Sequence, residues 1–265
     1  MLKIGILGVG CIGGANLEAF KKLGFDTIPH DIILDTKIED LLDSDIIFSC
    51  LPTPSNEDGS CNTSIIENEI YLLNQLEYKN PICIRSTVVP GFTQSLIDQY
   101  PDLEIAYSPE FLRERCALDD FVNNHNLLAI GCTNHSTFEL IKRCHGYYPK
   151  NIEKMTPTEA ELLKYFNNVY AALRITFANV FYELCDKLNS DYSHIKDSYI
   201  KTGKAMDMYL DVSEGLRGYA GMCLPKDTKA LIARMQELNL EYDLIKSIDI
   251  DNDKFKKTVF EGMRK

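Results

Sequence analysis

The sequence predicts an α/β protein in which a doubly wound N-terminal sheet is followed by a long connecting helix and a small all-helical domain. Three observations lead to this fold class. Short apolar runs alternate with helical patterns over residues 1–150, as expected of parallel strands joined by crossover helices. A glycine-rich turn follows the first run. Beyond residue 150, the apolar residues recur with a helical period alone.

The strands are predicted from short apolar runs. They are expected at residues 2–7, 25–30, 45–51, 81–86, 103–107 and 126–131. The third run, residues 45–51, does not alternate between apolar and polar side chains, which indicates a strand buried on both faces. A helical pattern follows the glycine turn to Leu23, and Gly24 is expected to close that helix.

The second half of the chain has a different character. We place a domain boundary near residue 150, which gives a sheet domain at 1–150 and, at 151–265, a domain made of the long helix and the helices after it. A long amphipathic pattern over about residues 157–188 predicts a single connecting helix, because no proline or glycine interrupts it. The remainder is predicted to be helical except for a glycine-rich segment at residues 215–221.

The start of the long helix carries a recognisable signal. Thr156-Pro157-Thr158-Glu159 fits a capping box, with Pro157 at the first helical position. Glu161 follows closely, and we interpret it as helix capping as well.

The composition excludes several classes of protein. A net charge of −11 argues against nucleic acid or an anionic membrane as a partner. No apolar run approaches the length of a membrane span, and residues 1–7 lead into a glycine turn instead of a signal-peptide cleavage site. The nine cysteines lack the spacing of a disulfide framework, so we expect a reducing, cytoplasmic location. The five histidines are scattered and no CxxC occurs, so no metal site is expected.

The glycine turn is a candidate dinucleotide site. Gly8-Val9-Gly10-Cys11-Ile12-Gly13 matches GxGxxG between a strand and a helix, and Asp31 lies eighteen residues beyond Gly13. Glycines let a pyrophosphate approach the backbone, and the helix N-terminus supplies N–H donors. Asp31 would accept hydrogen bonds from the adenosine ribose and repel a 2′-phosphate, which favours NAD over NADP. The alternative is a glycine-rich turn that binds no ligand. The expected NAD contacts in this region are Gly8, Gly10, Cys11, Ile12, Gly13 and Asp31.

Cys223 marks a second candidate site. Pro225 suits the first turn of a helix, and glycines precede the cysteine. A thiol at a helix N-terminus near Lys226 should ionise more readily than an ordinary cysteine. Asp227 could act as a base or orient a water molecule. The alternative is a buried structural cysteine, which is a common environment for this residue.

Further segments line up in a specific order along the chain. They are Leu51–Pro54 with Asp58-Gly59, Ser86–Gly91, Tyr107–Glu114, Glu161–Asn168 and Cys223–Asp227. In this order the chain resembles the UDP-glucose/GDP-mannose 6-dehydrogenase family from residue 1 to about residue 255. It departs from the family pattern at Cys11, Arg217 and Ala220, and in a short segment between Asp31 and Asp45. The chain ends where the family's C-terminal nucleotide-sugar-binding domain would begin, so we expect a short form without that domain.

The resemblance implies an NAD enzyme that oxidises the C6 alcohol of a nucleotide sugar to a carboxylate in two hydride transfers. Cys223 would capture the aldehyde and carry a thioester, while Lys164 and Asn168 would stabilise the oxyanion. Asp227 would assist the nucleophile or the hydrolytic water. The implied catalytic residues are Cys223, Lys164, Asn168, Asp227, Thr87, Glu110 and Glu114. The additional implied cofactor contacts are Thr53, Thr87, Glu114 and Lys226, and the implied substrate contacts are Glu110, Phe111, Leu112, Lys164, Asn168 and Ala220.

Physical reasoning on the residues agrees with part of this picture. Lys164 and Asn168 share one face of the predicted helix, where a cation and an amide can stabilise negative charge on O6. Glu110 and Glu114 would share a face if their segment forms a helical turn. The alternative for each residue alone is a solvated surface group. For the whole chain, the alternatives are a catalytically impaired protein that binds NAD or a sugar nucleotide, and an NAD dehydrogenase of a smaller hydroxy-substrate.

The long helix also predicts an assembly. Its aromatic and aliphatic residues are spread around more than one face, so the sheet domain can cover only part of them. Two-fold contact is the commonest way to bury such a surface, and in the resembled family the matching helix forms the dimer core. We therefore expect a homodimer through this helix, with a nucleotide sugar as the small-molecule partner.

Overall fold

The computed structural model describes residues 1–255. Its contacts divide the chain into two units. Unit 1 comprises Met1–Pro54 and Cys61–Lys164, and unit 2 comprises Ser55–Ser60 and the chain from Tyr165 onward. The domain boundary near residue 150 stays a prediction. The last ten residues of the predicted second domain, 256–265, lie outside the described residues.

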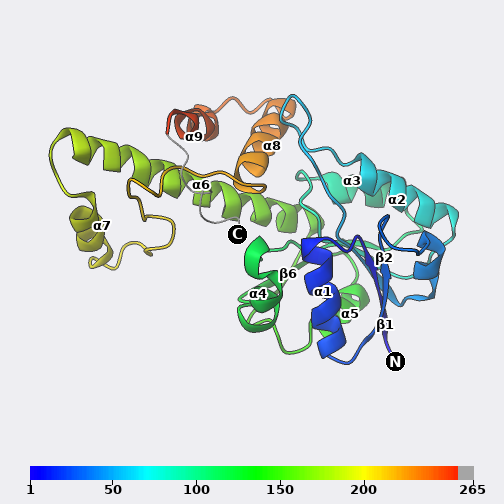
Figure 1. Ribbon diagram of the computed structural model, residues 1–265. Helices are drawn as coiled ribbons and strands as arrows, with labels where there is room; N and C mark the ends of the chain where they lie inside the picture. Colours follow the sequence, from blue (N-terminus) through cyan, green and yellow to red (C-terminus); the bar gives the residue numbers. More distant parts are fainter. Residues whose placement is uncertain (256–265) are drawn as a thin grey trace. The chain divides into compact units, whose positions relative to one another are not determined.

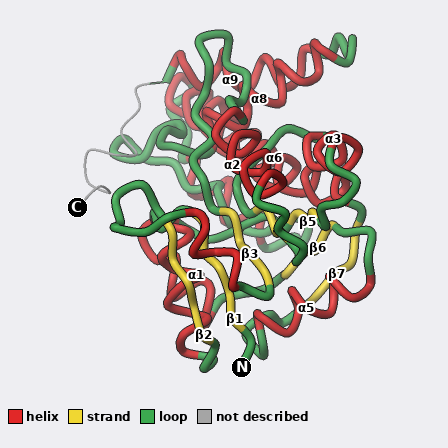
Figure 2. The backbone as a smooth tube through the Cα atoms, turned by 90° about the vertical axis from the view of Figure 1, so that its right-hand side faces the viewer, coloured by secondary structure: helices red, strands yellow, loops and turns green. Residues whose placement is uncertain are grey.

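Unit 1 is built on a mostly parallel sheet, which confirms the predicted fold class. In the described residues the sheet has seven strands in the order β2-β1-β3-β4-β5-β6-β7 (Figure 2). Among the strand pairs described in this sheet, only β5–β6 is antiparallel. The strands are β1 (Lys3–Leu7), β2 (Asp26–His30), β3 (Ile46–Ser49), β4 (Ile82–Ile84), β5 (Ile105–Tyr107), β6 (Leu128–Gly131) and β7 (Ile152–Met155).

Strand β7 was not predicted from the sequence. It pairs in parallel with β6 at the edge of the sheet. Its central residues, Glu153 and Lys154, are exposed, and only the terminal Ile152 and Met155 are partly buried. An edge strand with charged side chains avoids pairing with other chains, but it leaves no apolar run for the sequence analysis to detect.

Helices cover both faces of the sheet. One face packs against α1 (Cys11–Lys22), α4 (Ala117–Asn123) and α5 (His135–His145), and the other against α2 (Ser64–Gln75) and α3 (Phe92–Gln99) (Figure 1). Two short 3₁₀ turns, Ile38–Asp43 and Glu114–Cys116, complete the described elements of this unit. Helix α1 ends before Gly24, as predicted. The sheet is therefore doubly wound.

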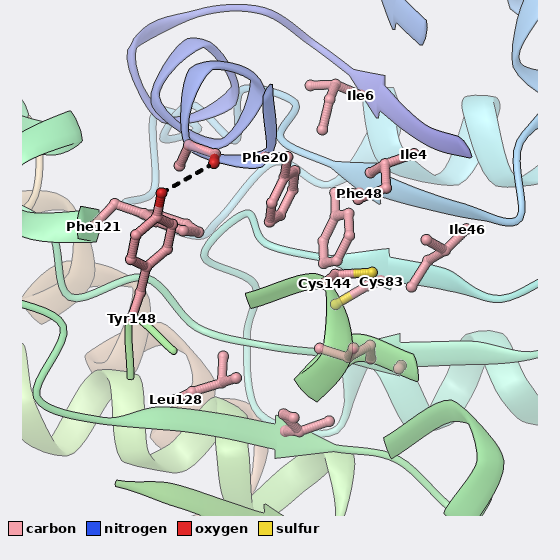
Figure 3. Packing of buried hydrophobic residues seen from close by; sticks show 14 of the residues in the cluster. Ile4, Ile6, Phe20, Ile46, Phe48, Cys83, Phe121, Leu128, Cys144 and Tyr148 are labelled. Atoms are coloured by element: carbon pink, nitrogen blue, oxygen red, sulfur yellow. Dashed lines mark hydrogen bonds between the residues drawn. The ribbon is translucent and has the colours of Figure 1, made fainter. Parts of the chain in front are cut away.

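Strand β3 contributes to both cores. Ile46 and Phe48 face one cluster of buried side chains, and Ile47 faces the other. Figure 3 shows the first cluster, in which the Phe20 and Phe48 rings lie 4.9 Å apart between centroids. This confirms a strand buried on both faces, as its uninterrupted apolar run predicted.

The long helix α6 (Pro157–Lys187) begins as predicted. The Thr156 backbone N–H donates to the Glu159 carboxylate at 2.8 Å, and the Glu159 N–H donates to the Thr156 hydroxyl at 3.3 Å, which completes the capping box. Glu161 also caps a helix, but that helix is α3. Its fully buried carboxylate accepts the N–H groups of Gly91 and Thr93 at 2.6 and 2.7 Å.

The regular elements described in unit 2 are helices. Most of α6 belongs to this unit, together with α7 (Tyr192–Ile200), α8 (Leu224–Glu237) and α9 (Asp243–Lys254). One core cluster joins α6 to α7, and a second joins α6, α8 and α9 around the buried Tyr219. Among residues 1–255, no helix combines the length and the apolar composition that crossing a membrane requires.

Candidate functional site

The glycine turn after β1 is shaped by close backbone approach. Gly8 has a φ of +87°, and a Cβ on it would lie 2.9 Å from the Cys50 carbonyl oxygen. A Cβ on Gly13 would lie 1.8 Å from the Gly8 carbonyl oxygen. Gly10 is different, because it is exposed at the N-cap of α1 and a Cβ there would meet nothing within 4 Å. Gly8 and Gly13 are thus needed for the close packing of the turn's backbone, whereas Gly10 borders open space at the helix N-terminus.

Asp31 lies beside this turn. One carboxylate oxygen, Oδ2, accepts the Val9 N–H at 2.6 Å, and Oδ1 accepts the Ile33 N–H at 3.1 Å. Strands β2 and β3 flank β1 on opposite sides, so the turn stands where the strand order reverses. Open α/β sheets bind ligands at such a switch point, outside the carboxyl ends of the strands.

The loops that follow the neighbouring strands are tied together. The Thr53 hydroxyl donates to the Thr87 carbonyl at 2.8 Å, which joins the loop after β3 to the loop after β4. The exposed Cys11 thiol donates to the Glu114 carbonyl at 3.2 Å, which brings the backbone of Glu114 to the glycine turn. Ile12 lies half-buried in the first turn of α1. These contacts link Thr53 to Thr87 and Cys11 to Glu114, which are four of the residues predicted to bind the cofactor.

The segment after β5 meets the start of α6. The Lys164 ammonium donates to the Glu110 carbonyl oxygen at 2.5 Å and lies 5.7 Å from the centre of the Phe111 ring. Leu112 is half-buried and packs against the core cluster beneath α1. Of the predicted substrate residues of unit 1, Glu110, Phe111 and Lys164 therefore lie together, and Leu112 packs into the core.

Glu110 and Glu114 do not share a helical turn, so that expectation was wrong. Residues 108–113 form no helix, and Glu114 only starts a short 3₁₀ turn. The backbone groups in between have other partners. The Lys164 ammonium donates to the Glu110 carbonyl, and the Arg113 N–H donates to the Asp120 carboxylate at 2.9 Å.

A buried charged network lies behind Glu110, and sequence reasoning missed it. The Arg85 guanidinium, at the end of β4, forms an ion pair with the Glu110 carboxylate. It also donates to the Ser108 hydroxyl at 2.9 Å and to His145 Nε2 at 3.3 Å. His145 Nδ1 lies 2.8 Å from the Ile141 carbonyl, so that nitrogen carries the proton and Nε2 accepts.

Burial controls the ionisation of this network. Desolvation lowers the pKa of the Arg85 guanidinium and lowers the pKa of His145 well below its ordinary value. A neutral His145 is consistent with its role as an acceptor. One sequence signal could have revealed the network, because Arg85 continues an apolar strand that is otherwise fully buried.

Unit 2 carries the cysteine at the start of α8. Cys223 is exposed at the N-cap, and Pro225 lies in the first turn, as predicted. The exposure of Cys223 argues against the alternative of a buried structural cysteine. Ala220, in the preceding loop, is half-buried.

Asp227 is the buried centre of this part of unit 2. It is 1% exposed, accepts the Asn168 amide at 2.6 Å on Oδ2, and pairs with the Lys226 ammonium at 2.6 Å on Oδ1. Its N–H donates to the Cys223 carbonyl at 2.8 Å. The predicted residues thus form two groups, one in unit 1 around Glu110 and Lys164 and one in unit 2 around Asp227. Helix α6 carries Lys164 and Asn168 one turn apart.

Comparisons with known proteins match two consecutive parts of the chain to one family. Residues 34–148 match the NAD binding domain of the UDP-glucose/GDP-mannose dehydrogenase family, and residues 158–254 match its central domain. The UDP-glucose 6-dehydrogenase AglM of Haloferax volcanii is 27% identical, over 95% of this chain and 70% of the relative. The UDP-glucose 6-dehydrogenase of Campylobacter jejuni is 33% identical, over 80% of this chain and 54% of the relative. The GDP-mannose 6-dehydrogenase of Pseudomonas aeruginosa is 28% identical, over 78% and 50%.

Solved structures share the fold. A UDP-glucose dehydrogenase from Pyrobaculum islandicum superposes with a TM-score of 0.88 at 24% identity, covering 96% of this chain and 68% of that one. A 3-hydroxyisobutyrate dehydrogenase from Mycobacterium tuberculosis superposes with a TM-score of 0.78 at 14% identity, covering 96% and 94%. The chain spans between 50% and 70% of the length of the three curated relatives described above.

Proposed function

Because the chain belongs to the UDP-glucose/GDP-mannose dehydrogenase family, we propose that it oxidises the C6 alcohol of a nucleotide sugar to the carboxylate with NAD. One observation carries the chemistry. Cys223 is an exposed thiol at the N-terminus of α8, one turn before the buried Asp227 that Asn168 and Lys226 hold. A helix N-terminus favours the thiolate, which is the nucleophilic form of cysteine.

The glycine turn fits NAD. The pyrophosphate would bind at the N-terminus of α1, where a Cβ on Gly10 would meet nothing within 4 Å and the first turn has no acidic residue. Asp31 would hold the adenosine ribose, and bound NAD supplies the hydride acceptor. An Asp31→Ala variant should lose NAD affinity and tolerate NADP better, as measured by calorimetry. Unchanged NAD affinity in this variant would count against the placement.

The proposed reaction consists of two successive oxidations at C6. In the first, C6 loses a hydride and its hydroxyl loses a proton, which gives the aldehyde. In the second, Cys223 Sγ adds to the aldehyde carbon, and loss of a hydride from that adduct leaves a thioester. Water then cleaves the thioester to the carboxylate and the thiol. Lys164 and Asn168 would donate to O6 when it carries negative charge.

Counting NADH tests this chemistry. The wild type should form two NADH per substrate molecule, and Cys223→Ser should stop after one or accumulate a covalent adduct detectable by mass spectrometry. Asn168→Ala should lose on the order of 10²-fold in rate. Cys116→Ser is a matched control that keeps a hydrogen-bonding atom near Asp120 and should turn over normally. If Cys223→Ser forms acid as fast as the wild type, Cys223 is structural.

The substrate class is part of the proposal. We propose a nucleotide sugar because the relatives are named for UDP-glucose and GDP-mannose. A panel of sugar nucleotides and small hydroxy acids tests it. NAD binding without NADH formation would favour a binding protein, and one NADH from a hydroxy acid would favour a dehydrogenase of smaller substrates.

We also propose a homodimer through α6. Within unit 2 the helix exposes large apolar side chains, and the Phe177 and Phe181 rings lie tilted against each other with centroids 4.6 Å apart. The exposed set is Phe166, Tyr170, Phe177, Val180, Phe181 and Leu184. A dimer would remove this surface from water. A monomeric mass by light scattering at micromolar concentration would contradict it.

We further propose a cytoplasmic location, because the spacing of the nine cysteines suits a reducing compartment. Cell fractionation with an antibody to the chain tests this assignment, and recovery outside the cytoplasm would contradict it.

A further inference from the structure

The segment that leads into Cys223 has no regular structure of its own. Residues 217–222 belong to no helix or strand, and Gly218 and Gly221 have φ values of +61° and +89°. Gly218 and Tyr219 are nevertheless buried. Buried backbone N–H and C=O groups need partners, and here those partners must come from side chains.

Asn179 of α6 supplies the first partner. Its side chain is 1% exposed, and Oδ1 accepts the Gly218 N–H at 3.1 Å and Arg217 Nε at 2.7 Å. The amide nitrogen donates to the Ile175 carbonyl at 2.9 Å, which fixes the orientation of the amide on its own helix. Asn179 therefore anchors the start of the segment to α6.

Asn252 of α9 supplies the second partner. It is also 1% exposed; Oδ1 accepts the Tyr219 N–H at 2.8 Å, and Nδ2 donates to the Tyr219 carbonyl at 2.9 Å. One side chain thus satisfies both backbone groups of one residue, as a neighbouring strand would. The Tyr219 ring is buried with Val169 and Ile248, so the residue is fixed on two sides.

We propose that Asn252 is a positioning residue for Cys223, acting through the backbone of Tyr219. Only Ala220, Gly221 and Met222 separate Tyr219 from the cysteine, so a displacement of Tyr219 passes directly to the N-cap of α8. Helix α9 thereby sets the place of the nucleophile. This inference rests on the proposed function, in which Cys223 attacks the aldehyde, and adds a residue from the last described helix.

An isosteric variant tests the proposal. Asn252→Asp keeps an acceptor for the Tyr219 N–H but replaces the donor to the Tyr219 carbonyl with a carboxylate oxygen. We expect a changed rate of Cys223 alkylation by iodoacetamide, read on the Cys223 peptide by mass spectrometry. We also expect kcat to fall on the order of 10²-fold with KM for NAD unchanged, as misplacement of a reacting group requires. Asn239→Asp, an exposed residue between α8 and α9, is the matched control for charge.

Two readouts separate positioning from general destabilisation. A globally loosened unit 2 would also accelerate alkylation of the buried Cys185, whereas a positioning role changes Cys223 alone. If Asn252→Asp does not fold, hydrogen exchange on the wild type tests whether Asn252 holds the Tyr219 backbone. In that case the Tyr219 amide should exchange as slowly as the amides in the core of α9. Rapid exchange there, or a folded variant with unchanged alkylation rate and kcat, would overturn the proposal. Alkylation needs no turnover, so it remains informative even if Cys223→Ser proves fully active.

Discussion

The two units hold their functional side chains with different chemistry. Of the acidic, basic and histidine side chains that are buried among residues 1–255, Asp227 alone belongs to unit 2. The others lie in unit 1, and they are Arg85, Glu110, Asp120, His125, His145, Glu161 and Lys164. Apart from Asp227, unit 2 relies on neutral groups, such as the amides of Asn179 and Asn252 and the hydroxyl of Tyr192.

This difference determines what a substitution costs. Removing one partner of a buried ion pair leaves an uncompensated charge in a poorly polarisable interior. Removing one partner of a neutral hydrogen bond leaves only an unsatisfied dipole. Unit 1 should therefore be sensitive to single substitutions and to pH, while unit 2, away from the buried Asp227, should respond weakly to both.

The largest effect is expected at Arg85. An Arg85→Met variant leaves the Glu110 carboxylate buried without its cation, which should cost about 3–5 kcal/mol of the free energy of unfolding of unit 1. Urea unfolding followed by hydrogen exchange on β4 and β5 measures this loss unit by unit. The double variant Arg85→Met/Glu110→Gln removes both charges and should recover much of the stability. A single variant as stable as the wild type would break the comparison at its strongest point.

The next effect is a pH dependence confined to unit 1. Burial and the nearby Arg85 charge lower the pKa of His125 to about 4 from its ordinary 6.5. The unfolded chain therefore binds more protons than the folded one between these values, and stability must fall as the pH drops from 6.5 to 4. The loss should total about 3 kcal/mol, with His145 adding to it.

Urea unfolding at a series of pH values reports this slope. His125→Phe should flatten it, since a phenyl ring cannot take up the proton, whereas His194→Gln, at an exposed position of unit 2, should leave it unchanged. A slope that persists in His125→Phe at its full size would assign the pH dependence to other groups.

A smaller effect is expected at Glu161. Glu161→Gln keeps one oxygen for the N-terminus of α3 but loses the charge that strengthens the hydrogen bonds from Gly91 and Thr93. Hydrogen bonds to charged groups contribute about 1.5–3 kcal/mol, so the loss should be about 2 kcal/mol. Hydrogen exchange of the first turn of α3 measures it, and Gln94→Ala, which removes a surface hydrogen bond to Asp98, offers a control on the same helix. Unchanged exchange in Glu161→Gln would show that the charge is dispensable.

The sequence predicted most of the fold because strands and helices leave local signals. Apolar runs located β1 to β6 to within a few residues, and the capping box located the start of α6. Strand β7 left no such signal, because an edge strand with exposed Glu153 and Lys154 resembles a polar loop. The chemistry of the glycine turn was also local, since GxGxxG and its strand are adjacent.

The supporting networks could not be predicted because their members are distant in the sequence. Arg85 meets Ser108 and His145 only after β4, β5 and α5 have packed. Asn252 lies among aspartates on α9, a pattern that predicts a solvent-exposed position. Its side chain is nevertheless buried against Tyr219. A sequence pattern can name such a residue only when its partners are known.

The smallest effect should appear in unit 2, at Tyr192. Its hydroxyl donates to the Leu210 carbonyl at 2.9 Å, and burial raises the pKa of this hydroxyl, which stays protonated at and below neutral pH. Tyr192→Phe removes a neutral hydrogen bond and should cost about 1 kcal/mol, with no slope between pH 4 and 6.5. Urea unfolding followed by hydrogen exchange on α7 measures the change, and Tyr199→Phe, at an exposed position of the same helix, should cost nothing measurable. A loss as large as that of Arg85→Met would mean that neutral and charged networks support the two units equally, and burial alone would then govern the cost.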